Sequence, residues 1–181
     1  MKTLVVGDLH LKQRFVLSRI DALLDADAAI GRVVFLGDAC DDWGATEADE
    51  LDALEYQAQW AAARRERGLR VDVLLGSHDF CYIRGRRGPG SMMTVARELR
   101  TILEEKLQAQ LACAVGPYLC THAGLTNVWV GKFMPDVSEP MCAEALAQRL
   151  NEMLADSDNW VALDSCPPSR GGWSLPGPLW A

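Results

Sequence analysis

The stretch that decides the fold is Lys2-Thr-Leu-Val-Val-Gly-Asp-Leu-His10, in which a short run of aliphatic residues ends abruptly at Gly-Asp. The same form recurs at Arg32-Val-Val-Phe-Leu-Gly-Asp38 and at Val71-Asp-Val-Leu-Leu-Gly-Ser-His-Asp79. Nearly continuous Val and Leu runs are typical of strands that are buried on both faces. The repetition therefore predicts three buried strands, each of which ends in a polar loop.

Helices are predicted between these strands. Apolar residues recur at helical spacing within residues 15–24, and a second helix is predicted over about residues 47–67. Strands that alternate with helices in the order β-α-β-α-β imply a mostly parallel sheet, whose ligand sites lie in loops beyond the carboxyl ends of the strands. Asp8, Asp38 and His78 all fall in these loops.

The rest of the chain completes a single α/β domain over residues 1–181, a sandwich of mixed β-sheets flanked by helices. We predict a helix that Ser91 caps, a hairpin around Gly116-Pro117 whose second arm delivers His122, and a helix over about residues 139–154. Residues 156–181 are rich in Pro, Gly and Trp, so we expect an irregular tail. Because no closing element follows, we expect that a C-terminal portion of a longer parent protein is missing.

Composition and charge exclude several classes of protein. The chain has 181 residues, 49% of them hydrophobic, which is ordinary for one globular domain. Its net charge of −7 argues against long nucleic acid as a partner. The sequence lacks an apolar run of about 18 to 20 residues, so no membrane span is expected. Six scattered cysteines without a CxxC pair favour reduced thiols and a cytoplasmic location.

The strand-end residues suggest a metal site. Gly7-Asp8-Leu9-His10 places a carboxylate and an imidazole just past a strand, and Asp38 ends the neighbouring strand. Mixed Asp and His ligands suit Mn, Fe or Zn better than Mg or Ca, which favour shells of oxygen alone. A carboxylate such as Asp38 can bridge two ions, as two-metal phosphoesterases require, and His122 could then serve the second ion.

Taken in order, four motifs resemble those of calcineurin-like metallophosphoesterases, in particular the branch similar to serine/threonine phosphoprotein phosphatases and their phage or prophage relatives. The motifs are Gly7-Asp-Leu-His10, Gly37-Asp-Ala-Cys-Asp41, Gly76-Ser-His-Asp79 and Thr121-His-Ala-Gly124. The resemblance implies hydrolysis of a phosphate ester or anhydride by metal-activated water. The substrate would be a phosphorylated small molecule, a dinucleoside polyphosphate or a phosphoprotein.

The resemblance also implies a role for each motif residue. Asp8, His10 and Asp38 would bind the first of two divalent ions, with Asp38 bridging to the second ion at His122. His78 would be the proton donor, and Asp41 would keep its imidazole protonated and oriented. For a single histidine taken alone, the alternative is a hydrogen-bonded structural residue in a loop.

Three departures from the family pattern concern the second metal and the substrate. Ser77 stands where the family usually has an asparagine that binds the second metal, and a hydroxyl is a poorer ligand. Asp42 replaces an arginine that grips the phosphate in phosphoprotein phosphatases. The final Gly-His motif is absent, so the second metal site is expected to be weak or empty. The alternative function is a degenerate phosphoesterase fold that acts as a non-catalytic binding or scaffold module.

Two arginines are candidates for binding the substrate phosphate. Arg84 lies in a basic loop that follows His78 in the sequence, although an arginine-rich loop is more often a solvated surface. Arg170 lies in the tail, within a Ser169-Arg-Gly-Gly172 stretch that resembles a segment of the phage-type members. A planar guanidinium at either position could contact a phosphate through two parallel hydrogen bonds.

Overall fold

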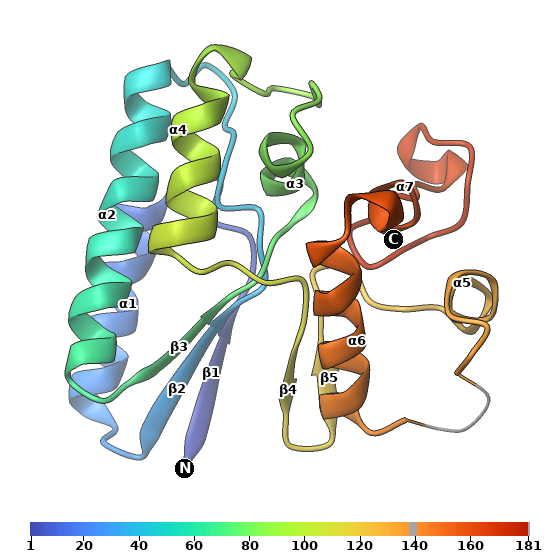
Figure 1. Cartoon of the computed structure of the whole chain (residues 1–181). Coiled ribbons are helices and arrows are strands. Elements are labelled where there is room, and N and C mark those ends of the chain that lie inside the picture. The colour runs from blue at the N-terminus through green and yellow to red at the C-terminus, as the bar shows by residue number, and fades with distance from the viewer. Residues whose placement is uncertain (138–140, 181) are drawn as a thin grey trace.

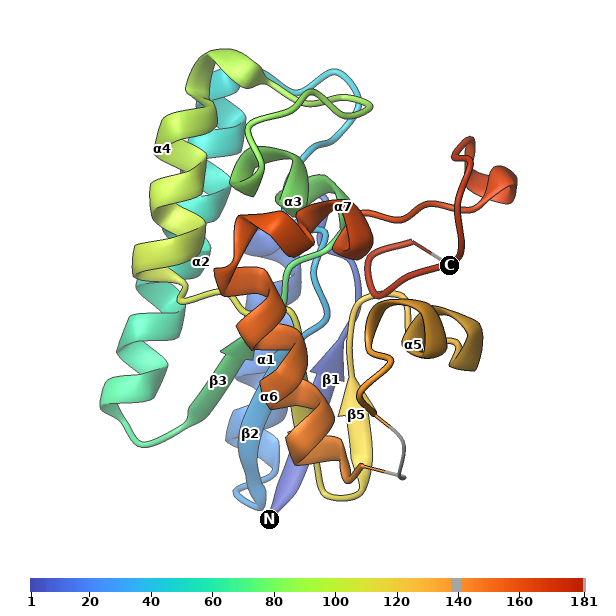
Figure 2. The same ribbon diagram turned by 45° about the vertical axis from the view of Figure 1, so that its right-hand side comes forward.

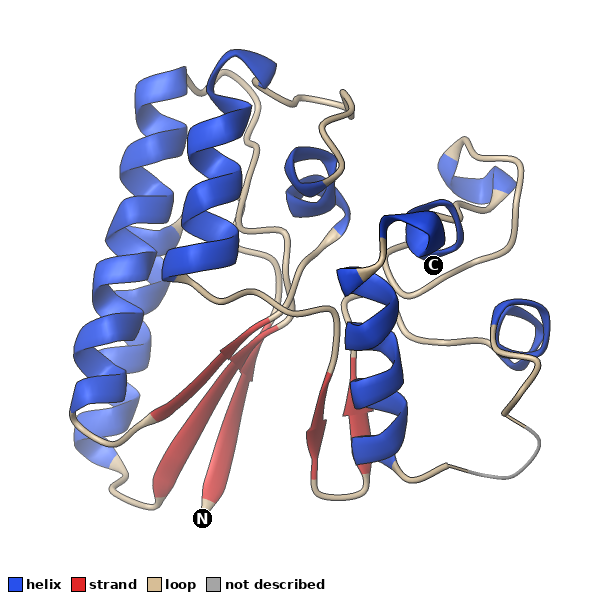
Figure 3. Ribbon diagram, viewed as in Figure 1, coloured by secondary structure: helices blue, strands red, loops and turns tan. Residues whose placement is uncertain are grey.

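The computed structural model describes residues 1–137 and 141–180. Its first sheet is parallel, with the strand order β1-β2-β3. These strands are β1 (Lys2–Val6), β2 (Ile30–Phe35) and β3 (Arg70–Val73), and they are connected by helices α1 (Gln13–Ala26) and α2 (Glu47–Glu66) (Figure 1). The predicted β-α-β-α-β order and parallel sheet are therefore confirmed, and Figure 3 shows the helices and strands in separate colours.

Helices α1 and α2 pack together on the first sheet through apolar side chains. Leu17 of α1 and Leu54 of α2 are fully buried in the same cluster as Phe35. Trp60 of α2 meets Phe35 edge to face, with ring centroids 5.8 Å apart. Thr46 begins α2 in a capping box with Asp49, which satisfies backbone donors at the start of the helix. Packing of this kind holds the loops at the ends of the strands in place.

The second sheet is an antiparallel hairpin formed by β4 (Cys113–Val115) and β5 (Tyr118–Cys120). Helix α6 (Ala143–Ala155) packs against this hairpin, as Figures 1 and 2 both show. Arg32 of β2 forms a buried ion pair with Asp72 of β3, with 2.7 Å between Nε and Oδ2, and also donates to the carbonyl of Ala114. The bond to Ala114 joins the two sheets, so parallel and antiparallel pairing coexist in one fold flanked by helices.

The segment after β3 differs from the prediction. Helix α3 (Ser77–Ile83) begins directly at the Ser77-His78 pair, where no helix was expected. The predicted cap at Ser91 is wrong, because its hydroxyl bonds the backbone of Gly88 within a turn. The chain becomes helical after that turn, as a 3-10 turn (Met93–Val95), helix α4 (Ala96–Thr101) and a π-turn (Ile102–Lys106).

The C-terminal part contains short helical elements joined by irregular segments. They are α5 (Asn127–Phe133), a 3-10 turn (Ser157–Asn159), α7 (Trp160–Leu163) and a second 3-10 turn (Pro168–Arg170). Residues 139 and 140, where a helix was predicted to begin, lie outside the described residues, and α6 starts at Ala143. Trp129 is fully buried, and its indole N–H donates to Ser165 Oγ at 3.1 Å. The tail is therefore packed against the domain.

The end of the tail lies beside the hairpin. The backbone N–H of Ala123, next to His122, donates to the carbonyl of Pro178 at 2.9 Å. Leu179 is buried in the main core. Within the described part of the chain, no helix is both long and apolar enough to cross a membrane.

Candidate metal centre

Asp8, His10 and Asp38 come together at one edge of the parallel sheet. Each offers a ligand atom, and these atoms all lie within 4.8 Å of one another. His10 Nε2 is 3.8 Å from Asp38 Oδ2 and 4.0 Å from Asp8 Oδ2. The convergence follows from the topology, because β1 and β2 are parallel neighbours and both loops leave the same edge.

The hairpin brings His122 to the same place. His122 follows β5, and its Nε2 lies 3.4 Å from Asp38 Oδ2, while its Nδ1 lies 3.9 Å from Asp8 Oδ1. Ser77, at the start of α3, also lies next to Asp38, with its hydroxyl oxygen 3.3 Å from Oδ2. The structure thus gathers all five predicted metal-binding residues around the carboxylate of Asp38.

The two imidazoles are oriented as metal ligands would be. His10 Nδ1 donates to the carbonyl oxygens of Cys40 at 3.1 Å and Asp41 at 2.8 Å. His122 Nδ1 donates to the carbonyl oxygen of Leu36 at 3.0 Å. Because a carbonyl can only accept, each Nδ1 carries a proton, so Nε2 is the ring nitrogen that faces the carboxylates and would bind a metal ion once it is deprotonated.

The donor set therefore fits a divalent ion. Ligand atoms that share one ion at about 2.0–2.2 Å from it lie roughly 3–4 Å apart. The Nε2 to Oδ2 separations of 3.4 to 4.0 Å in this cluster have that size. Burial favours the neutral acid of Asp38, but the imidazole of His122 and the backbone N–H of His78 outweigh it and lower the pKa of this carboxyl group. Asp38 is consequently ionised and ready to bind a cation.

Backbone strain is concentrated at this centre. His10, Asp38 and Asp41 adopt positive φ angles of 40°, 51° and 64°. Such a conformation is uncommon for residues other than glycine and costs of order 1–3 kcal/mol at each position. The N–H groups of Leu9 and His10 both donate to the carbonyl of Asp38, which locks the two loops together. Strain held in this way is characteristic of functional sites.

His78 and Asp41 form a second chemical unit next to the ligand cluster. His78 Nδ1 lies 2.8 Å from Asp41 Oδ2, and this hydrogen bond raises the pKa of His78 against the opposing effect of burial. The phenol of Tyr82 donates to the other oxygen of Asp41. The backbone N–H of Asp41 donates to Glu50 at 2.9 Å. Tyr82 therefore holds the carboxylate that orients His78, and Glu50 holds the backbone of the same residue.

Two buried acids support the site and were not predicted from the sequence. Asp79 accepts hydrogen bonds from the backbone of Ala39 and Cys40, both at 3.0 Å, and of Gly76 at 2.8 Å. It thereby joins the loop after β2 to the start of α3, and burial raises the pKa of its carboxyl group. An acid at the third position of a helix is a known capping signal, which could have identified Asp79.

Glu50 is the second of these acids. Its side chain is fully buried on α2, one of its oxygens accepts from Asp41, and the other has no hydrogen-bond partner among the described residues. Burial is the main reason why the pKa of Glu50 rises to about 7. No local pattern distinguishes this glutamate from the solvent-facing acids around it in the sequence, so only the packed fold identifies it.

The two candidate arginines lie in different places. Arg170 lines a cavity of about 510 Å³ together with the ligand cluster and His78. The structure does not bring Arg84 to this cavity, since its guanidinium forms an ion pair with Asp164 and lines a separate hollow. The prediction that Arg84 binds the substrate phosphate is therefore not supported. Asp42, beside Asp41, is paired with Lys12.

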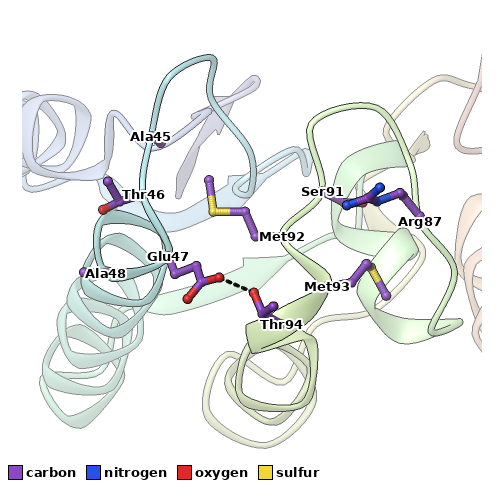
Figure 4. Close-up of a pocket in the computed structure, with 9 residues that line it drawn as sticks. All are labelled: Ala45, Thr46, Glu47, Ala48, Arg87, Ser91, Met92, Met93 and Thr94. Carbon is purple, nitrogen blue, oxygen red and sulfur yellow. Dashed lines mark hydrogen bonds between the residues drawn. The ribbon is translucent and has the colours of Figure 1, made fainter.

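A larger hollow near the site lacks metal ligands. It measures about 660 Å³ and lies between the start of α2 and the segment around residues 91–94, as Figure 4 shows. Its one carboxylate, Glu47, accepts a hydrogen bond from Thr94 across the hollow, and no histidine or cysteine is among its described lining residues. The chemistry is therefore located at the strand ends and not in this hollow.

Comparison with known proteins gives a family and a fold. The sequence profile of the calcineurin-like phosphoesterase family matches residues 1–180. No curated protein matches the sequence. A crystal structure of a point mutant of a cold-active protein tyrosine phosphatase is similar, with a TM-score of 0.53 at 15% sequence identity, and this likeness shows the fold.

The structural likeness and the family profile cover different shares of the proteins compared. The structural likeness covers 99% of this chain and 56% of that one, so this chain spans just over half the length of that phosphatase. The family profile, in contrast, extends over nearly the whole chain and includes the strand-end loops that carry the ligand cluster. The chain belongs to the calcineurin-like phosphoesterase family.

Proposed function

We propose that this protein is a metal-dependent phosphoesterase that hydrolyses a phosphate ester or anhydride. One observation carries the proposal: the ligand cluster, the imidazole of His78 and the guanidinium of Arg170 all line a single cavity. Membership of the calcineurin-like phosphoesterase family supports the same reaction class. The name of the structural neighbour, a protein phosphatase, is consistent with a phosphorylated substrate.

Asp8, His10 and Asp38 would hold one divalent ion, and Asp38 and His122, with Ser77 beside them, would hold a second. The mixture of imidazole and carboxylate donors suits Mn, Fe or Zn. Such ions, when bound, make water nucleophilic near neutral pH and offset the negative charge of a phosphate group. The second ion would be bound more weakly, because a hydroxyl is a poorer ligand than the carboxylate or imidazole groups around it.

The chain's own residues would then transfer the proton and hold the phosphate. His78 uses Nδ1 to bond Asp41, so its Nε2 remains to give a proton to the leaving oxygen. Asp41 stabilises the charged imidazole and keeps it from rotating. Arg170 has the planar shape to bind two phosphate oxygens from the wall of the same cavity. Together these groups satisfy the needs of in-line hydrolysis without a phosphoenzyme.

The alternative, a non-catalytic scaffold, is less well supported. A scaffold has no physical need for strained backbone at His10, Asp38 and Asp41, which together cost several kcal/mol by the magnitudes above. It also has no need for a buried carboxylate that raises the pKa of a partly buried histidine. Three substrate classes are open to the proposed enzyme: phosphorylated small molecules, dinucleoside polyphosphates and phosphoproteins.

Hydrolysis of p-nitrophenyl phosphate and bis-p-nitrophenyl phosphate with added Mn²⁺ tests the proposal. The wild-type protein should turn over at least one of these esters. His78→Ala should retain the metal, measured by elemental analysis, yet lose about 10²- to 10⁴-fold in kcat, which is the usual contribution of a general acid. Asp38→Asn should lose both the metal and the activity. Equal rates in all three proteins would reject the catalytic assignment.

A further inference from the structure

A second, smaller cavity adjoins the one that holds the ligand cluster. It measures about 260 Å³ and shares two of its walls, His10 and His78, with the larger cavity. The two imidazole rings meet edge to face, with centroids 5.1 Å apart and planes at 90°. The ring pair thus forms a boundary, with the metal ligands and Arg170 on one side and the smaller cavity on the other.

The position of His78 relates this cavity to the proposed reaction. A phosphate bound among the metal ligands and Arg170 would place its leaving oxygen next to His78, since His78 is the proton donor of the proposed function. The group attached to that oxygen has to extend past the imidazole boundary. The smaller cavity begins at that boundary, so it is where the first atoms of the leaving group would lie.

The walls of the smaller cavity offer flat apolar surfaces. Trp43, in the loop between β2 and α2, lines the cavity, and this residue is 89% exposed. Pro89, from the loop after α3, also lines the cavity. An indole that packs against almost nothing in its own chain is available to stack on a ligand. Aromatic pairs of this kind contribute about 0.5–1.5 kcal/mol beyond the area they bury.

The charge of the smaller cavity selects against anionic leaving groups. Asp41 and Asp42 both line it, and no lysine or arginine is among its described lining residues. Lys12 pairs with Asp42 but is not part of that lining. A leaving group that carries a further phosphate, as in a phosphoanhydride, would approach these carboxylates at a cost in electrostatic energy. An uncharged ring would not.

The size of the cavity also limits the occupant. Sites for drug-sized molecules measure about 300–1,000 Å³. At about 260 Å³ the smaller cavity suits one ring joined directly to the ester oxygen, and not a nucleoside with its sugar and base.

We propose that the smaller cavity is a leaving-group subsite that selects phosphate esters of uncharged aromatic alcohols. In this subsite Trp43 is the residue that determines specificity, and Asp42 disfavours anhydrides. The inference rests on the proposed phosphoesterase function. In the reaction, a water oxygen bonds to phosphorus and the bond from phosphorus to the aryl oxygen breaks. His78 protonates that oxygen and regains a proton from the water through solvent, so the products are a phenol and inorganic phosphate.

Rates on matched esters test the role of Trp43. We would measure kcat/KM for phenyl phosphate and cyclohexyl phosphate with Mn²⁺ in the wild-type protein and in Trp43→Ala, Trp43→Phe and Trp173→Ala. Trp173 is the matched control, because its residue is 98% exposed and it lines a different hollow. Comparison of one ratio between variants removes the difference in leaving-group acidity between the two esters.

The expected result is selective. The ratio of phenyl to cyclohexyl phosphate should fall about two- to tenfold in Trp43→Ala, the range that ring stacking provides. It should be retained in Trp43→Phe and in Trp173→Ala. An unchanged ratio in Trp43→Ala, or an equal fall in Trp173→Ala, would overturn the assignment of Trp43.

The role of Asp42 is tested with a phosphoanhydride. In Asp42→Asn the ratio of kcat/KM for ADP to that for phenyl phosphate should rise several-fold, because one carboxylate charge is removed from the cavity wall. No rise in this ratio would overturn the electrostatic part of the inference.

A binding measurement separates failure of the subsite from failure of the proposed function. Benzylphosphonate has a methylene in place of the ester oxygen of phenyl phosphate and cannot be hydrolysed at that bond. In calorimetry with Mn²⁺ it should bind the wild-type protein more tightly than cyclohexylmethylphosphonate does, and Trp43→Ala should abolish the difference. Equal binding of both phosphonates by the wild-type protein would overturn the subsite, whereas absence of turnover on every ester with the difference in binding retained would overturn the proposed function and leave a site that only binds aromatic rings.

Discussion

The Nδ1 atom of His78 lies 2.8 Å from Oδ2 of Asp41, which joins the first turn of α3 to the loop after β2. Asp41 is itself held by the phenol of Tyr82 and, through its backbone N–H, by Glu50. Because the carboxylate and the backbone N–H of Asp41 are both restrained, the hydrogen bond to Nδ1 fixes the orientation of the His78 ring and leaves Nε2 as its second nitrogen.

Asp41→Asn should move the alkaline limb of the activity profile to lower pH. The hydrogen bond to Asp41 raises the pKa of His78. A general acid acts in its protonated form, so activity is present below this pKa and is lost as pH rises through it. Removing the carboxylate charge lowers the pKa of His78 and brings the loss to a lower pH. The profile of kcat/KM with Mn²⁺ and an NMR titration of His78 would both report the change.

Asp52→Asn is a suitable control for that experiment. Its carboxylate pairs with Arg14 on the surface of α2, away from the site. Its pH profile should match that of the wild-type protein. If the alkaline limb of Asp41→Asn stayed in place or moved upward, Asp41 would not be the residue that supports His78.

Glu50→Gln should remove a pH dependence of stability. Burial raises the pKa of Glu50 from 4.5 to about 7, so the folded protein binds this proton more tightly than the unfolded chain does. The free energy of unfolding therefore falls as pH rises from about 4.5 to about 7. One pKa unit corresponds to about 1.4 kcal/mol, so the fall is on the order of 3 kcal/mol. Urea unfolding of both proteins across this range would measure it.

Glu50→Ala separates the titration from the hydrogen bond. The amide oxygen of Gln can still accept from Asp41, whereas Ala leaves that buried N–H without its partner at 2.9 Å. We expect Glu50→Ala to be about 1–3 kcal/mol less stable than Glu50→Gln at every pH. Equal pH slopes for the wild-type protein and Glu50→Gln would show that Glu50 is ionised in the fold throughout.

Gly76→Ala should disrupt the metal centre by steric contact. A Cβ atom at Gly76 would lie 2.2 Å from both the backbone nitrogen and Oδ1 of Asp38. Neither atom can move without displacing the carboxylate that all the other ligands surround. Calorimetric titration with Mn²⁺ should show a large loss of affinity. Gly7→Ala is the control, since a Cβ there meets nothing within 4 Å, and it should bind as the wild-type protein does.

Arg170→Ala should impair activity, whereas Arg84→Ala should impair stability. Arg170 lines the cavity with the metal ligands, so its loss should lower kcat/KM about ten- to hundredfold, as expected for a hydrogen bond between charged groups. Arg84 pairs with Asp164, so its loss should lower the melting temperature with KM unchanged. A raised KM in Arg84→Ala together with an unchanged KM in Arg170→Ala would reverse this assignment.

The order of strands and helices and the class of fold could be predicted from the sequence. Runs such as Val33 to Leu36 are apolar and end at Gly-containing loops, and this local pattern reflects burial on both faces of a parallel sheet. The same pattern indicates where Asp8 and Asp38 lie, because the ends of parallel neighbours meet at one edge. For these residues the local sequence pattern therefore predicts the long-range contact as well.

Local pattern failed where a side chain had a choice of partners. Ser91 has the residue type of a helix cap, yet it bonds Gly88 in a turn. Arg84 has the residue type and position of a phosphate ligand, yet its guanidinium forms an ion pair with Asp164, an acid from far along the chain. These two contacts do not depend on the residues next to Ser91 and Arg84 in the sequence, so the periodicity of the sequence could not have predicted them.

By itself, then, the sequence determined the strands, their connecting helices and the set of residues capable of binding a metal ion. Only the tertiary structure decided that His122, at the end of the predicted hairpin, reaches Asp38, that Arg170 and not Arg84 lines the cavity of the metal ligands, and that Glu50 and Asp79 are buried. The physical reason is that strand and helix formation follow the periodic burial of nearby residues, whereas these contacts join segments between nine and more than a hundred residues apart and depend on how the finished elements pack.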